Sequence, residues 1–164
     1  MEFLQWLEQT SLSVWVRESP SVWAYPSVLL FHTIGMTLCV GVAAGINVRI
    51  LGVAPDLRLA PLARFFPILW TGFWINAATG VVLLMQDATT KLTNPAFFVK
   101  MVFIALAIVN LRMIRARIFG DPRIDEGPLA RSAKVLAAVS LLLWLGAITA
   151  GRLLAYIGPV SGFD

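Results

Sequence analysis

The chain has 164 residues, of which 59% are hydrophobic and only 13% are charged. This composition excludes an ordinary soluble domain, in which about a quarter of the residues are charged. The net charge of +4 could suggest nucleic acid as a partner. The basic residues are, however, segregated along the chain in a way that predicts membrane topology, so we expect no nucleic-acid partner.

Four apolar stretches follow a short N-terminal segment. A bilayer core about 30 Å thick requires about 20 apolar residues of helix. We expect the spans at about 22–48, 65–86, 95–119 and 132–157. Residues 2–18 carry apolar side chains at helical spacing, which predicts a short amphipathic helix at the membrane interface. The expected fold class is therefore all-α: an antiparallel four-helix transmembrane bundle that forms one domain over residues 1–164.

The third span has the shortest apolar stretch, because only Met101–Leu111 separates Lys100 from Arg112. Both basic side chains can extend toward opposite interfaces, which lengthens the usable helix. Asn94 followed by Pro95 predicts the start of this helix, with asparagine as the N-cap and proline in the first turn.

The basic residues predict which way the chain crosses the membrane. Nine of the thirteen lie in, or at the span ends beside, the two loops that a four-span chain places on one side. These nine are Arg49, Arg58, Arg64, Arg112, Arg115, Arg117, Arg123, Arg131 and Lys134. Positive charge near span ends is retained in the cytoplasm. We therefore expect a multi-pass protein with its N- and C-termini outside.

His32 is the only histidine, and it lies about a third of the way into the first span from the outer side. A polar side chain at that depth is a functional candidate; the alternative is a neutral imidazole bonded to a neighbouring helix. A single histidine excludes a haem b with two histidine ligands from one chain, whereas a histidine–methionine haem stays open. Met36 lies one turn after His32, and this pair also suits copper(I) as a metal site.

Charged side chains gather toward the outer ends of the spans. Lys100 and Arg152 lie inside the expected outer boundary, and Asp87 at the end of the second span is their obvious counter-ion. A charge at the centre of a span costs about 2.5–3.5 kcal/mol, so these groups should approach one another or a ligand. One interpretation is a polar pocket shared with His32 that suits an anionic headgroup, a quinone oxygen or a haem propionate. The other is snorkelling side chains with a single salt bridge.

Trp74 lies near the midplane of the second span, away from the interfaces where tryptophan concentrates. This position suits a ring that stacks against a flat cofactor, and it equally suits simple packing. Asn76 and Asn110 are expected to form hydrogen bonds between helices.

Small residues one turn apart predict where helices pack closely. Gly41 and Gly45 form such a step in the first span, and Gly146 with Ala150 forms one in the fourth. These steps let helix backbones approach each other in lipid, where no hydrophobic effect drives association.

Two runs of sequence resemble a known family. HTIGMTLCVGVAAGINVRILG (32–52) and NPAFFVKM (94–101) accompany a W-x-x-x-W pattern and a T-G pair in the second span. Together they resemble a family of uncharacterised four-span bacterial inner-membrane proteins, in which a first-span H-x-x-G motif precedes an L-R-x-L-G-like motif at the end of that span. The corresponding residues here, VRILG at 48–52, depart in part from that pattern. The resemblance implies a bacterial origin and an inner-membrane location, but no activity. The matching positions are His32, Arg49, Asn94, Pro95 and Lys100.

The function classes that remain open are those of a membrane subunit. The sequence has no glycine-rich phosphate loop, no HExxH and no paired carboxylates within a span, so we expect no enzyme of the soluble type. One class is a small redox-linked or cofactor-holding subunit, with haem b, a quinone or copper as the cofactor. A second is a non-enzymatic subunit that binds lipid or a partner, and a third is an oligomeric transporter of metal or solute. The expected partners are the lipid bilayer, a second copy, or other membrane subunits.

Overall fold

The structure is a computed structural model that describes residues 2–154 and 156. Its elements in chain order are α1 (Glu2–Glu8), α2 (Ser11–Glu18), α3 (Tyr25–Leu51), η1 (Ala60–Phe65), α4 (Phe66–Met85), α5 (Ala88–Thr93), α6 (Pro95–Arg117) and α7 (Arg131–Leu153). Four helical segments are long and apolar enough to cross a membrane, namely α3, η1 with α4, α6, and α7. The expected all-helical, four-span architecture is therefore confirmed.

The helix ends follow from local chemistry. The Asn94 side chain accepts a hydrogen bond from the backbone nitrogen of Ala96 at 2.9 Å, and Pro95 is the first residue of α6. The predicted start of the third span is thus confirmed, and this helix has 23 residues, enough to cross a bilayer. Gly52 ends α3 in the left-handed conformation, with φ 111°. The predicted end of the fourth span at residue 157 lies outside the described residues.

The N-terminal segment forms two short helices rather than the single one expected over 2–18. The chain turns at Thr10, whose hydroxyl donates to the carbonyl of Leu7 at 2.8 Å and accepts from the backbone nitrogen of Ser13 at 3.4 Å. A threonine in this capping position starts a new helix. Ser13 and Val16 are buried against the bundle. The large apolar side chains that stay exposed are Phe3, Trp6, Leu12 and Trp15.

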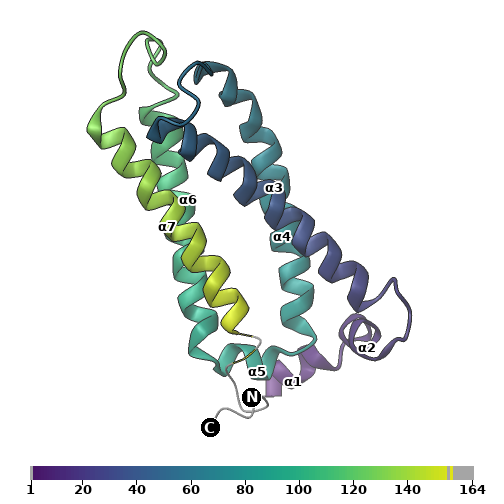
Figure 1. Cartoon of the computed structure of the whole chain (residues 1–164). Helices are drawn as coiled ribbons and strands as arrows, with labels where there is room; N and C mark the ends of the chain where they lie inside the picture. Colours follow the sequence, from purple (N-terminus) through teal and green to yellow (C-terminus); the bar gives the residue numbers. More distant parts are fainter. Residues whose placement is uncertain (1, 155, 157–164) are drawn as a thin grey trace.

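The four long helices form two antiparallel pairs. α3 packs along α4 and α6 packs along α7, while α3 also contacts α7. Figure 1 shows the pairs meeting near the loops 52–59 and 118–130, here called the loop end, and diverging toward α1, α2 and α5, here called the capped end. Near the loop end, the buried Asn47 amide donates to the hydroxyl of Ser140 at 2.8 Å and joins α3 to α7.

The α3–α4 pair is held by a contact between two backbones. A β-carbon added at Gly35 would lie 2.6 Å from the backbone nitrogen of Asn76, and one added at Gly72 would lie 2.6 Å from Cβ of Leu38. Both distances are too short for any side chain, so only glycine permits this crossing. The prediction of close packing at Gly41 and Gly45 is wrong for the helices of one chain, because no described residue lies within 4 Å of a β-carbon at either position.

The fourth span packs closely against α6 at Gly146, but through a side chain and not through the close backbone approach that was expected. A β-carbon there would lie 2.6 Å from the ring of Phe103 on α6. The aromatic ring thus occupies the space above the glycine, and Ala147 and Ala150 are buried on the same helix. The α6–α7 pair therefore depends on a ring over a glycine, whereas the α3–α4 pair depends on backbone contact.

The two loops at the loop end are tied together by Asp125. Its carboxylate accepts hydrogen bonds from the backbone nitrogens of Leu59 at 2.7 Å and Ala60 at 3.2 Å, and it pairs with Arg58 at 3.4 Å. The hydrogen bond from Leu59 is the main cause of a lowered pKa of Asp125. Burial opposes this shift, and the hydrogen bond from Ala60 and the charge of Arg58 lower the pKa further. Consequently the loops 52–59 and 118–130 lie at the same end of the bundle, as a four-span chain requires.

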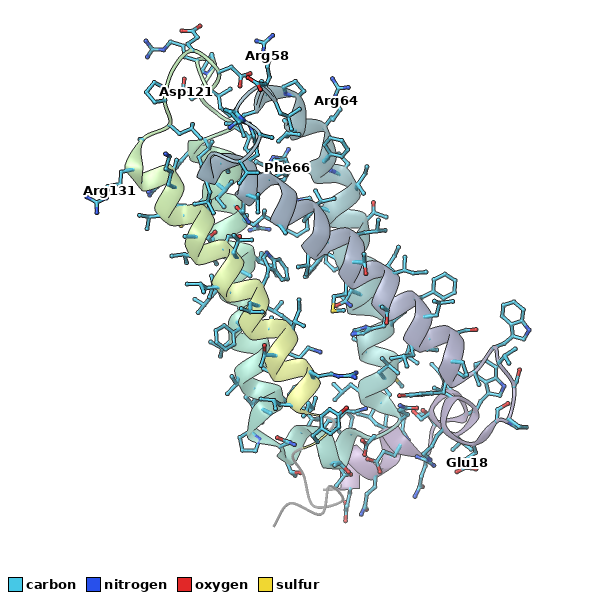
Figure 2. The ribbon with its side chains drawn as sticks, in the orientation of Figure 1. Glu18, Arg58, Arg64, Phe66, Asp121 and Arg131 are labelled. Carbon is cyan, nitrogen blue, oxygen red and sulfur yellow. The ribbon has the colours of Figure 1, made fainter. Side chains whose placement is uncertain are left out.

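Basic side chains concentrate at this loop end. Figure 2 shows Arg58, Arg64 and Arg131 there, and Glu18 at the capped end. Arg49 donates to two carbonyls of the loop 52–59. Its role in the structure is therefore to close that loop at the end of α3.

We predict that Gly35→Ala and Gly72→Ala each destabilise the folded protein, because the added methyl group would overlap the backbone or the Cβ of the partner helix. Overpacking of this kind costs about 1–3 kcal/mol. Gly41→Ala is the matched control in the same helix and should leave the midpoint of thermal unfolding in detergent unchanged or slightly raised. Equal midpoints for all three variants would contradict the glycine crossing.

Candidate ligand-binding cavity

A cavity of about 220 Å³ lies at the capped end, between the two helix pairs. It is lined from α3, α4, α5, α6 and α7. Figure 1 shows that the α3–α4 and α6–α7 pairs diverge at this end and that α5 lies across it between α4 and α6. Its polar lining side chains are Tyr25, His32, Gln86, Lys91 and Lys100. Leucine side chains and a phenylalanine supply much of the remaining wall. An apolar cavity with a few convergent polar groups is the usual form of a small-ligand site.

His32 is held in place by α4. The Asn76 amide donates to the His32 carbonyl at 2.8 Å, which confirms the hydrogen bond between helices expected for this asparagine. The ring nitrogen Nδ1 lies 3.1 Å from the hydroxyl oxygen of Thr79, and that hydroxyl donates to the carbonyl of Ile75 at 2.7 Å. Because the hydroxyl has one proton, its oxygen must accept from Nδ1–H of His32. Nε2 is then the ring nitrogen available to a ligand, and it has no hydrogen-bond partner within the described chain.

Glycine provides the room for this arrangement. A β-carbon added at Gly80 would lie 3.2 Å from Cε1 of His32, a distance that would force the ring to shift. Gly80 and His32 both line the cavity, from α4 and α3 respectively. A larger residue at position 80 would therefore displace the imidazole and reduce the cavity at the same time.

Lys100 reaches the cavity across α7. A β-carbon added at Gly151 would lie 3.5 Å from Cδ and Cε of Lys100 and 3.7 Å from Nζ, so the lysine side chain runs over this glycine. Within the described residues, the ammonium group has no ion pair and no hydrogen bond. The side chain is partly buried. The cavity therefore contains one cation that no described residue neutralises.

Lys91 is the second cation of the cavity, but it has partners. Its ammonium lies 3.7 Å from the carboxylate of Asp87, one helical turn away, and donates to the carbonyl of Leu83. Burial lowers the pKa of Lys91 from its usual value, and the neighbouring Asp87 opposes that shift. Asp87 thus neutralises Lys91 rather than Lys100.

A second pocket of about 520 Å³ adjoins the cavity at the capped end and shares Tyr25 and Gln86 with it. Asp87 lines this outer pocket together with Glu8 and Arg17. Glu8 accepts a hydrogen bond from the backbone nitrogen of Thr89 at 2.7 Å, and Arg17 donates to the carbonyl of Gln86 at 3.2 Å. These two contacts attach α1 and α2 to the corner between α4 and α5, next to the cavity.

The structure brings only part of the predicted set together. Arg152 is exposed, with its guanidinium carbon 5.8 Å from the centre of the Tyr156 ring, and it does not line the cavity. Trp74 is 66% exposed and faces away from the bundle. Met36 is half-buried and lies outside the cavity lining. Asn110 forms no hydrogen bond within the described residues, so the expected interhelical bond there is absent.

Sequence reasoning did not identify Lys91, Thr79 or Gly151 as parts of the site. Lys91 lies in the connection between two spans, where a charge has an ordinary explanation. Thr79 lies three residues after Asn76, and this spacing on one helix face could have indicated a polar stripe facing His32. Gly151 was identifiable only as a packing residue. No group of three His, Cys, Asp or Glu side chains in the described part of the chain could hold a metal ion.

The fold defines an integral, multi-pass membrane protein with four spans. No protein-family model, curated protein or solved structure matches the chain.

We predict that Thr79→Val changes the tautomer of His32, because valine has the same shape but cannot accept from Nδ1–H. Since His32 is the only histidine, ¹⁵N-histidine labelling gives the NMR signals of this ring alone. The unaltered protein should show a protonated Nδ1, and Thr79→Val should show an increased population protonated at Nε2. Thr71→Val is the control on the same helix, since Thr71 donates to its own helix at Pro67. A ring protonated at Nε2 in the unaltered protein would contradict the assigned hydrogen bond.

Proposed function

We propose that this protein is a bacterial inner-membrane subunit that holds the polar head of an amphiphilic molecule in the cavity at the capped end. In this proposal Lys100 and His32 bind the head, and Lys91 with Asp87 closes the cavity toward the outer pocket. The hydrocarbon part of the ligand lies among the lipids. The protein binds and positions the ligand without transforming it.

The observation that carries this proposal is the unneutralised Lys100. A charge at the level of a membrane span is costly unless it meets a partner or water. The side chain runs over Gly151 into the cavity, although a lysine so near a helix end could extend outward to the interface. A bound polar head would provide the missing partner.

The cavity volume favours a head over a complete ligand. Sites that enclose a drug-sized molecule measure about 300–1,000 Å³, and this cavity measures about 220 Å³. A porphyrin or a whole lipid would therefore extend beyond it. The apolar lining at Leu29, Leu83 and Phe97 suits the first methylene groups below such a head.

The proposed orientation places the loop end in the cytoplasm and the cavity in the outer half of the membrane. Its support is the concentration of basic residues in the loops 52–59 and 118–130 and their flanks. The bacterial inner membrane is proposed from the resemblance of 32–52 and 94–101 to a bacterial family.

Cysteine labelling tests this orientation. With Cys39 replaced, a single cysteine introduced at the exposed position Glu126 should react with a membrane-impermeant reagent only from the cytoplasmic side. Labelling from the outer side would contradict the proposed orientation.

A second candidate is a redox-linked subunit that holds a quinone. The observation in its favour is the free Nε2 of His32, a hydrogen-bond acceptor beside the donor Lys100. Nε2 could accept a hydrogen bond from the hydroxyl of a quinol, and Lys100 could donate one to the carbonyl of a quinone. The two candidates share the cavity and differ in the chemical class of the head.

Co-purification tests the proposed function. Protein isolated in mild detergent should retain about one amphiphile per chain, detectable by mass spectrometry of an organic extract. Gly151→Leu should lose it, because the leucine side chain would occupy the space of Lys100. Gly41→Leu introduces the same side chain where nothing lies within 4 Å and should retain the ligand. Equal amounts of amphiphile per chain in the extracts of both variants would contradict the proposal. A quinone in the extract would favour the second candidate.

A further inference from the structure

We infer that the group bound by Lys100 is the phosphate of an anionic lipid headgroup. This inference rests on the proposed function and specifies the chemical class of its ligand. The observations that carry it are the charges of the cavity, the placement of the neighbouring carboxylates, and the volume and lining of the cavity.

The charges of the cavity do not cancel. Its two ammonium groups belong to Lys91 and Lys100, and its lining contains no carboxylate. Asp87 lies outside the lining and pairs with Lys91. Glu8 lines the outer pocket and accepts a hydrogen bond from the backbone nitrogen of Thr89 near the start of α5. Among the described residues that line the cavity, the positive charge of Lys100 is left without a partner, so an anion is the ligand that completes the site.

The hydrogen-bonding groups also suit an oxyanion. Lysine ammonium groups present three donors and bind phosphate as compact positive charges. Tyr25 and Gln86, also in the lining, can each donate a further hydrogen bond. An oxyanion with several acceptor oxygens uses these donors together, whereas a single quinone carbonyl uses one or two. Nε2 of His32 is an acceptor and would bind a hydroxyl group of the lipid head instead of a phosphate oxygen.

The cavity volume and lining indicate a lipid as the source of the phosphate. A volume of about 220 Å³ accommodates a phosphate group, but it is below the roughly 300–1,000 Å³ of sites that enclose a drug-sized molecule, so the acyl chains of a lipid would lie outside it. The apolar wall formed by Leu29, Leu83 and Phe97 would bury a glycerol backbone and would gain nothing from a free inorganic ion. The acyl chains would then lie among the surrounding lipids.

The test adds four probes to the purified protein in an uncharged detergent and measures the midpoint of thermal unfolding. The probes are phosphatidylglycerol, phosphatidylcholine, diacylglycerol and inorganic phosphate. Phosphatidylglycerol should raise the midpoint most, because ligands that bind the folded state stabilise it. Lys100→Met should weaken the apparent affinity for phosphatidylglycerol about tenfold or more, as expected for loss of a charged hydrogen bond.

Two further variants serve as controls. Lys100→Arg keeps the charge and should retain the preference for phosphatidylglycerol. Lys134→Met removes a lysine from the exposed start of α7 at the loop end and should leave that preference unchanged. If Lys100→Met does not fold, the comparison of Lys100→Arg with Lys100→Gln replaces it.

Each outcome has one meaning. Stabilisation by inorganic phosphate alone, dependent on Lys100, would support the phosphate site and assign its source to solution, overturning the lipid assignment. Equal stabilisation by diacylglycerol and phosphatidylglycerol, unaffected by Lys100→Met, would overturn the phosphate and leave amphiphile binding standing. No stabilisation by any probe, together with an extract free of amphiphile, would overturn both.

Discussion

Helices in a bilayer gain no hydrophobic driving force from packing against each other, because lipid tails are as apolar as leucine. Close contact must therefore supply the association energy, and in this protein it is concentrated at a few positions. Gly35 against Gly72 joins α3 to α4, and Phe103 over Gly146 joins α6 to α7. The hydrogen bond from Asn47 to Ser140 then connects the pairs near the loop end. Away from that bond the pairs diverge, and the cavity lies in the divergence.

The same divergence explains why a charged residue is tolerated at this depth. Lys100 could not be accommodated between tightly packed helices, because burial of an unpaired ammonium is among the most costly changes that a protein interior can undergo. At the capped end it meets a cavity with polar groups, while Gly151 lets its side chain lie flat on α7. α1 and α2 cover this end through contacts of Glu8 and Arg17. The divergence of the helix pairs, the charge of Lys100 and the cover formed by α1 and α2 therefore all lie at the capped end.

Hydropathy and capping residues predicted the spans well, because length in a bilayer and the Asn94–Pro95 start are local properties. The site also depends on how each helix is rotated about its axis, and this rotation is determined by the neighbouring helices and not by the local sequence. Lys100 and Arg152 lie at a similar depth, yet one enters the cavity and the other turns to Tyr156. Gly41 formed a plausible packing step, but the neighbouring helix contacts Gly35 instead. Nothing in a single span shows which of its faces the partner helix will cover.

The most direct measurement of the central claim is the proximity of the Lys100 nitrogen to lipid phosphorus. The chain has three lysines, so Lys91→Arg with Lys134→Arg leaves Lys100 as the single ¹⁵N-labelled ammonium while keeping both charges. Solid-state NMR in phosphatidylglycerol bilayers should show strong dephasing of this signal by ³¹P, and an Arg152→Met background should not reduce it. If ³¹P does not dephase the Lys100 ammonium signal in bilayers where the protein is folded, the proposed contact with lipid phosphate is contradicted.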